Sequence, residues 1–111
     1  MHPAHASCEQ WLHRYQPAAS ERADVDKMLK LLAAHSAAEG GPSPFSRDHV
    51  DPGHFTASAW VLSADRQQAA LIFHSKLKRW LHPGGHIEPT DADPRAAALR
   101  EGRRRAARCG R

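Results

Sequence analysis

The sequence has few of the features that mark secreted, disulfide-stapled or membrane-spanning proteins. It contains two cysteines, Cys8 and Cys109, which lie near opposite ends and show no metal-binding or redox spacing. This favours a reduced chain in the cytoplasm. No apolar run approaches the roughly 20 residues of a membrane-spanning helix, and the first ten residues lack the apolar core of a signal peptide. We therefore expect no membrane partner.

Aromatic residues are also scarce, and the net positive charge comes from one end of the chain. Residues 95–111 carry seven arginines and one acid, a net charge of +6, whereas the first 94 residues carry nine basic and eleven acidic side chains, a net charge of −2. The body of the chain is thus mildly acidic and offers no aromatic-rich binding face. We expect nucleic acid to bind nonspecifically at most, through the arginine-rich tail. The sequence leaves the oligomeric state open.

The 111 residues suffice for one small domain, which the sequence divides into three parts. Residues 1–38 are expected to form a helical extension, 39–53 a linker or ordered loop rich in Gly and Pro, and 54–111 the main domain. Two stripes of apolar residues at helical spacing predict two packed helices, the second capped by Ser20. The stripes are Cys8, Trp11, Leu12 and Tyr15, then Val25, Met28, Leu29 and Leu32.

Alternation of apolar and polar residues predicts strands in the main domain. Residues 55–63 place Phe55, Ala57, Ala59 and Val61 on one face, and residues 69–74 have the composition of a buried strand. Residues 64–67 are typical of a turn, so the two strands are expected to pair as a hairpin. A further short strand is expected at residues 81–82 or 86–87.

The stretch from residue 83 to residue 101 combines a glycine pair, an acidic loop and a helix start. Gly84 and Gly85 permit a tight turn and a close approach of the backbone. Asp93 suits a helix N-cap and Pro94 the first helical position, and the residues that follow have high helix propensity. Arg100 and Glu101 then lie inside the predicted helix.

This stretch resembles the first half of the Nudix box, the signature of the Nudix hydrolases. Gly85 opens the motif, Asp91 stands where its first acid belongs, and Arg100–Glu101 follows with one residue more than the usual spacing. The resemblance extends upstream to residue 54 and covers about half of the chain. It implies an α/β fold, namely a partial Nudix α/β/α sandwich preceded by two helices, and the hydrolysis of small-molecule diphosphates.

The resemblance also implies a site that uses Mg²⁺ or Mn²⁺, because attack by water at phosphorus requires the phosphate charge to be neutralised. Glu101 would be a metal ligand or would position the base, Gly85 would offer a carbonyl to the metal, and Arg100 would fix the loop through an ion pair. Lys76 and Arg79 could contact the substrate phosphates, although a solvated strand end explains them equally well.

The second half of the motif departs from the family pattern. Gly102 replaces a bulky apolar residue, Arg104 and Arg105 replace a pair of glutamates, and Ala107 and Arg108 replace a glycine and an apolar residue. Positions 101, 104 and 105 share one helix face, so both arginines are expected to pair with Glu101 and compete with a cation. We therefore expect impaired hydrolysis, or a module that binds a diphosphate without catalysis. Residues 102–111 read either as a solvated basic tail or, as we prefer, as a frame-shifted end of a truncated domain.

Overall fold

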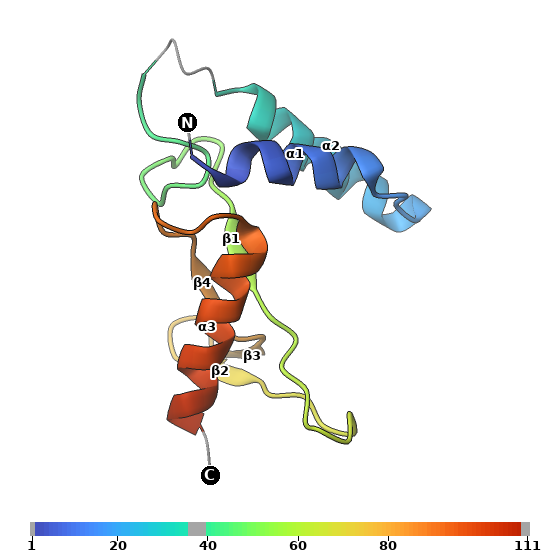
Figure 1. Cartoon of the computed structure of the whole chain (residues 1–111), viewed down its shortest axis with the longest axis vertical. Coiled ribbons are helices and arrows are strands. Elements are labelled where there is room, and N and C mark those ends of the chain that lie inside the picture. Colours follow the sequence, from blue (N-terminus) through green and yellow to red (C-terminus); the bar gives the residue numbers. More distant parts are fainter. Residues whose placement is uncertain (1, 36–39, 110–111) are drawn as a thin grey trace.

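The computed structural model describes residues 2–35 and 40–109, with side chains up to Arg104 within the last helix. In this part of the chain three α-helices accompany four short strands, which pair into two antiparallel two-stranded sheets, β1–β4 and β2–β3 (Figure 1). The expectation of a mixed α/β class is confirmed. The elements are α1 (Ala4–Arg14), the 3-10 turn η1 (Ala19–Glu21), α2 (Arg22–Ala33), β1 (Thr56–Ser58), β2 (Ile72–His74), β3 (Arg79–Leu81), β4 (Gly84–His86) and α3 (Pro94–Cys109).

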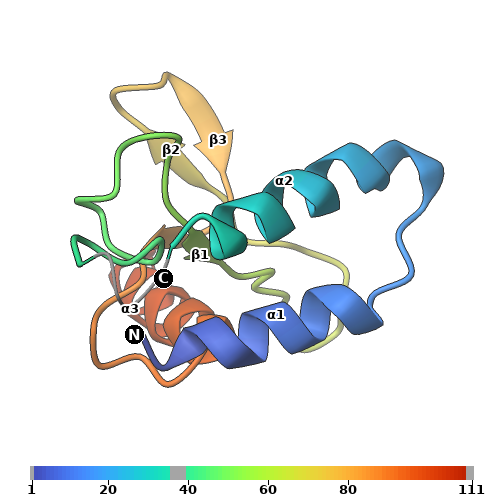
Figure 2. The same ribbon diagram turned by 90° about the horizontal axis from the view of Figure 1, so that it is seen from above.

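The two amino-terminal helices are present as predicted and run antiparallel side by side (Figure 2). Cys8 and Leu32 of the predicted stripes are buried, which agrees with core packing. The same expectation is wrong for Trp11 and Tyr15, which are 40% and 49% exposed, and also for Met28. Each helix buries only a narrow part of its predicted apolar face. Trp11, Tyr15 and Met28, which lie outside that part, therefore remain in contact with solvent. None of the described helices is long and apolar enough to cross a membrane.

The predicted cap of the second helix is wrong. Helix α2 begins at Arg22 and has no side-chain cap, whereas Ser20 lies inside the 3-10 turn. The Glu21 side chain closes the 3-10 turn instead, because its carboxylate accepts a hydrogen bond from the backbone N–H of Ala18 (3.0 Å) and another from the hydroxyl of Tyr15 (2.7 Å). A carboxylate at the first turn also interacts favourably with the helix dipole.

Strands β1 and β4 form the platform on which α3 lies (Figure 1). Thr56 pairs with His86, and Ala57 pairs with Gly85. The alternation predicted for residues 55–61 is confirmed, because Phe55 and Ala57 are buried while Thr56 is exposed. This inward face is the surface that receives the helix.

The strand pairing agrees with the prediction only in part. Next to the predicted turn at residues 64–67, Leu62 and Ala69 form an antiparallel bridge, the N–H of Ser63 donates to the carbonyl of Gln68 (2.9 Å) and the N–H of Ala70 donates to that of Val61 (2.8 Å). The pairing does not extend further, because β1 and β2 belong to different sheets. Strand β2 pairs instead with β3, across a turn of four residues, 75–78. The predicted burial of residues 69–74 is also wrong, since Leu71 and Phe73 are 44% and 47% exposed.

The segment 40–53 contains neither helix nor strand and is an ordered loop, one of the two predicted alternatives. Phe45 in this loop is fully buried. Its ring stacks on Phe55 (centroid distance 4.8 Å) and on His2 (5.1 Å), so the loop joins the amino terminus to the sheet. The predicted boundary between residues 38 and 39 lies outside the described residues.

Candidate functional site

Helix α3 begins as the sequence predicts. Asp93 accepts a hydrogen bond through Oδ1 from the backbone N–H of Ala96 (2.7 Å), and Pro94 is the first helical residue. Asp at the N-cap satisfies an N–H that has no partner within the helix, and Pro has no N–H to leave unpaired. The cap fixes where the helix starts and therefore which residues of its second and third turns face β4.

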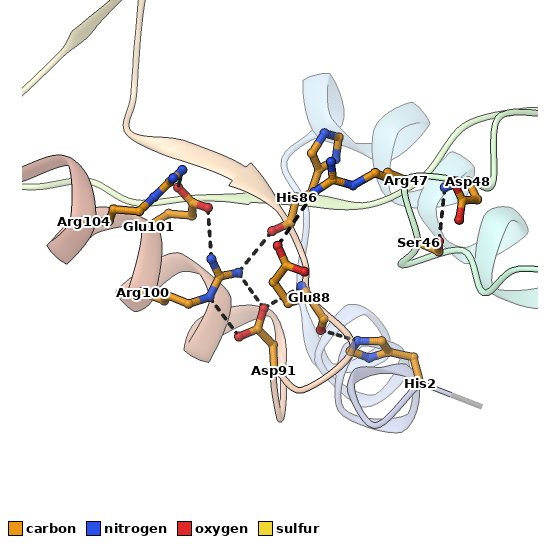
Figure 3. Close-up of polar contacts among 10 residues, drawn as sticks. All are labelled: His2, Ser46, Arg47, Asp48, His86, Glu88, Asp91, Arg100, Glu101 and Arg104. Carbon is orange, nitrogen blue, oxygen red and sulfur yellow. Dashed lines mark hydrogen bonds and ion pairs between the residues drawn. The ribbon is translucent and has the colours of Figure 1, made fainter.

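Asp91 and Arg100 form the polar centre of the site. Asp91 is 8% exposed, and its Oδ2 accepts hydrogen bonds from the backbone N–H of Glu88 and from Arg100 Nη2, both at 2.7 Å. Arg100 Nε donates to Asp91 Oδ1 (3.2 Å), and Nη2 also donates to the carbonyl of His86 (3.2 Å) (Figure 3). Arg100 thus makes the ion pair with the loop that the resemblance implies, and it ties that loop to the end of β4.

The pKa values of this pair are shifted in the directions that stabilise the charged forms. The hydrogen bond from Arg100 lowers the pKa of Asp91 below its ordinary value, against the opposing effect of burial. The same hydrogen bond raises the pKa of Arg100. The carboxylate and the guanidinium are therefore both charged near neutral pH.

Glu101 lies beside this pair and is almost completely buried, at 3% exposed. Its Oε1 accepts a hydrogen bond from Arg100 Nη1 (3.1 Å), and its Oε2 accepts one from Arg104 Nη2 (2.8 Å) (Figure 3). Burial acts to raise the pKa of Glu101, but the hydrogen bonds and charges of Arg104 and Arg100 outweigh it and lower the pKa. Two arginines thus hold the carboxylate in its ionised form.

The structure brings Gly85 and Glu101 together. A Cβ built on Gly85 would lie 2.8 Å from Glu101 Oε1, and one built on Gly84 would lie 2.7 Å from the carbonyl oxygen of Ala57. The sequence predicts that the glycine pair lets the backbone approach a ligand; in the structure it lets the backbone of β4 approach Glu101 and β1. The predicted tight turn is wrong, because both glycines belong to β4 and neither has a positive φ. Glycine is required here for space rather than for an unusual backbone conformation.

Gly102 is the next contact of α3 with the sheet. It is buried, and a Cβ at this position would lie 3.3 Å from Ala59 Cβ and 3.5 Å from Val61 Cγ2. The sequence suggested that a glycine here leaves the helix without an apolar anchor. In the structure the helix approaches the sheet closely at this point, and the missing side chain makes that approach possible.

The described residues do not fit a Mg²⁺ or Mn²⁺ site. These ions prefer several oxygen ligands, and within residues 2–35 and 40–109 no group of three or more His, Cys, Asp and Glu side chains lies close enough to share an ion. Both carboxylate oxygens of Glu101 already accept hydrogen bonds from arginines, which cannot ligate a cation. The predicted pairing of Arg105 with Glu101 concerns a side chain outside the described part of the chain.

A cleft of about 640 Å³ lies between the two sheets, against the strand that carries the glycine pair. Its walls combine the backbone of Gly84 and Gly85 with three histidines, His74, His82 and His86. The two predicted phosphate contacts, Lys76 and Arg79, do not line it. Both are exposed on the β2–β3 hairpin, so the structure does not bring them together with Glu101.

Sequence reasoning missed one residue that supports the site. His2 Nδ1 accepts a hydrogen bond from the backbone N–H of Ala4 (2.9 Å), so Nε2 carries the proton and donates to the carbonyl of Glu88 (2.8 Å). This contact fastens the amino terminus to the loop that Asp91 and Arg100 organise. No local pattern could have revealed it, because the two residues lie 86 positions apart.

Comparisons of the chain with protein-family models, with curated proteins and with solved structures find no match.

Proposed function

We propose that this chain has a Nudix-type active-site corner that recognises a small-molecule diphosphate, and that hydrolysis at this corner is suppressed. The proposal keeps the partial Nudix sandwich and the diphosphate substrate that the sequence resemblance implies. One observation carries it: Gly85, Asp91, Arg100 and Glu101, which the motif places together, form one contiguous polar cluster. Arg100 contacts both acids of this cluster at once.

The proposed suppression of hydrolysis follows from the two arginines that pair with Glu101. Its carboxylate is neutralised by Arg100 and Arg104 and does not depend on an added cation. A cation would have to displace Arg104, whose guanidinium keeps its charge at any physiological pH. Low turnover is therefore the expected behaviour of this chain, even with Mg²⁺ or Mn²⁺ in excess.

Diphosphate binding without hydrolysis is the second candidate, and the ion pair between Glu101 and Arg104 favours it. Because Arg104 neutralises the buried Glu101 carboxylate, the site needs no metal ion to stay folded. The adjoining cleft can admit a small ligand. Backbone groups of a glycine strand can approach such a ligand closely. The two candidates differ only in whether bond cleavage follows binding.

The decisive experiment compares the chain with Arg104→Glu and with the control Arg103→Glu. Residue 103 is exposed on the same helix, so the control makes the same charge change away from Glu101. Calorimetry measures Mn²⁺ and diphosphate binding, and phosphate release is followed over a panel of diphosphates. We expect diphosphate binding and little release from the wild type, and a new Mn²⁺ site in Arg104→Glu that Glu101→Gln removes.

Three results would change these conclusions. Rapid Mg²⁺-dependent cleavage by the wild type, abolished by Glu101→Gln, would refute suppression. Binding without any cleavage, in the wild type and in Arg104→Glu alike, would favour the second candidate. A wild-type chain that binds no diphosphate of the panel would refute both.

A further inference from the structure

The β2–β3 hairpin exposes an unusual amount of apolar surface. Phe73 pairs with Trp80 across the strands, so their side chains lie on one face, and Leu71 shares that face because strand residues alternate. These three residues are 47%, 65% and 44% exposed, and Leu77 in the turn is 57% exposed. We refer to Leu71, Phe73, Leu77 and Trp80 as the hairpin patch.

The segment of the chain that carries the hairpin patch contains basic but no acidic side chains. Between Asp65 and Glu88 the chain has no acidic residue, and Lys76, Lys78 and Arg79 occupy the turn and the start of β3. All three cations are exposed. The hairpin lies at the end of the molecule opposite the two amino-terminal helices (Figure 1). Phe73 and Leu77 also line the cleft between the two sheets, whereas Leu71 and Trp80 do not.

We propose that the hairpin patch docks onto an anionic lipid surface, with Leu77 and Trp80 entering the headgroup region and the three cations contacting lipid phosphates or carboxylates. Trp and Leu beside Lys and Arg are the combination that partitions into the membrane interface. The sequence predicts no membrane partner because no run is long enough to span a bilayer. A hairpin that lies on the surface needs no such run.

Two other occupants fit less well. A second copy of the chain would bring Lys76, Lys78 and Arg79 close to their own duplicates with no acid to pair with, and like charges repel. A single-stranded nucleic acid would need open aromatic faces for base stacking, but Phe73 and Trp80 pack edge to face on each other at a centroid distance of 5.4 Å. Leucines add nothing to base stacking, whereas they contribute fully to insertion between lipids.

The test uses the full chain with vesicles of phosphatidylcholine alone and of phosphatidylcholine with phosphatidylserine, measured by co-sedimentation. We expect binding to the anionic vesicles only, weakened by salt. The triple variant Lys76→Gln, Lys78→Gln, Arg79→Gln should weaken it about fivefold per charge, on the order of a hundredfold in total. The control Arg22→Gln, Lys27→Gln, Lys30→Gln removes the same charge from exposed positions of α2 and should bind nearly as well as the wild type.

Tryptophan fluorescence then locates the contact. A chain that keeps Trp80 alone, through Trp11→Phe and Trp60→Phe, should show a blue shift on anionic vesicles and quenching by brominated lipid. A chain that keeps Trp11 alone should show neither, although Trp11 is also exposed. Leu77→Ser should weaken binding in the otherwise wild-type chain, and circular dichroism checks that each variant is folded.

Several outcomes would overturn the proposal. Failure to bind anionic vesicles would do so directly. Vesicle binding that persists in the triple variant of Lys76, Lys78 and Arg79, called here the hairpin variant, would assign the membrane contact to the arginines of α3. Sedimentation as a dimer that Leu77→Ser dissociates would assign the hairpin patch to a second copy. Binding of a single-stranded oligonucleotide, lost in the hairpin variant and accompanied by no vesicle binding, would assign it to nucleic acid.

Discussion

Replacement of Arg100 by glutamine is the most informative single perturbation of the candidate site. The guanidinium donates two hydrogen bonds to Asp91, one to Glu101 and one to the carbonyl of His86. Asp91 and Glu101 are 8% and 3% exposed, so neither carboxylate can regain water without opening the site. Arg100→Gln therefore leaves two buried negative charges with reduced compensation.

The size of the effect follows from burial. Removing one partner of a buried ion pair costs about 3 to 5 kcal/mol. Water shields the guanidinium partly, because the side chain of Arg100 is 36% exposed, so the lower end of that range applies. In a domain of about 100 residues each kcal/mol shifts the melting temperature by about 4 to 8 °C. We expect Arg100→Gln to lower the free energy of unfolding by about 3 kcal/mol and the melting temperature by at least about 12 °C.

A double-mutant cycle of Asp91→Asn and Arg100→Gln, followed by thermal and urea denaturation, isolates the pair itself. A coupling free energy of about 1 to 3 kcal/mol is expected for directly contacting groups. Arg103→Gln makes the same substitution at an exposed position of α3 and should change stability by less than about 0.5 kcal/mol. A coupling energy near zero, or an Arg100→Gln variant as stable as this control, would refute the reasoning.

Three further predictions concern the same corner. Gly84→Ala should destabilise the fold more than Gly85→Ala, because a Cβ at residue 84 would meet the backbone of β1, whereas a Cβ at residue 85 would meet the end of the Glu101 side chain. Denaturation of both variants tests which one loses more stability, and equal losses would contradict the prediction. Gly102→Ala should stabilise the fold by less than about 1 kcal/mol, because the gain in helix propensity is offset in part by the 3.3 Å contact of the new Cβ with Ala59 Cβ. A loss of stability in the same assay would contradict this and would show that Ala59 cannot shift to make room. The arginine contacts lower the pKa values of Asp91 and Glu101 despite burial. Both carboxyls therefore stabilise the fold fully above pH about 5, where the unfolded chain is also ionised, and this contribution is lost as pH falls through the lowered native values. Denaturation midpoints measured against pH should show this loss and should show less of it in Asp91→Asn; stability that rises on acidification would contradict the assignment.

The parts of the fold that the sequence predicts well depend on short spacings. Asp93 and Pro94 mark the start of α3 because capping chemistry involves residues two or three positions apart. The inward face of β1 follows from strict alternation at Phe55 and Ala57. The contact of Arg100 with the loop is expected only from the resemblance to a known motif, and the structure contains it.

The parts that the sequence does not predict depend on distant partners. Phe45 lies in a segment whose glycines and prolines indicate a linker, yet its ring is fully buried against Phe55 and His2. Strand β1 pairs with β4 rather than with the nearer residues 69–74, and a side chain at Gly84 or Gly85 of β4 would collide with β1 or with Glu101. The exposure of Phe73 could not be predicted from the sequence either, because an apolar strand has the same sequence pattern whether or not another layer of the protein covers it.

The charge balance around Glu101 connects the fold of this chain to its proposed chemistry. A carboxylate that α3 buries against β4 must be compensated, because an unpaired buried charge costs several kcal/mol. A metal ion and a guanidinium both provide positive charge, but a metal needs further oxygen ligands on the same helix face, whereas a guanidinium needs only the one carboxylate. Arg104, three positions along the helix, supplies the charge from within the chain. In the proposed function, the residue at this position therefore decides whether the corner depends on a cation, and arginine there makes the stability of the corner independent of metal binding.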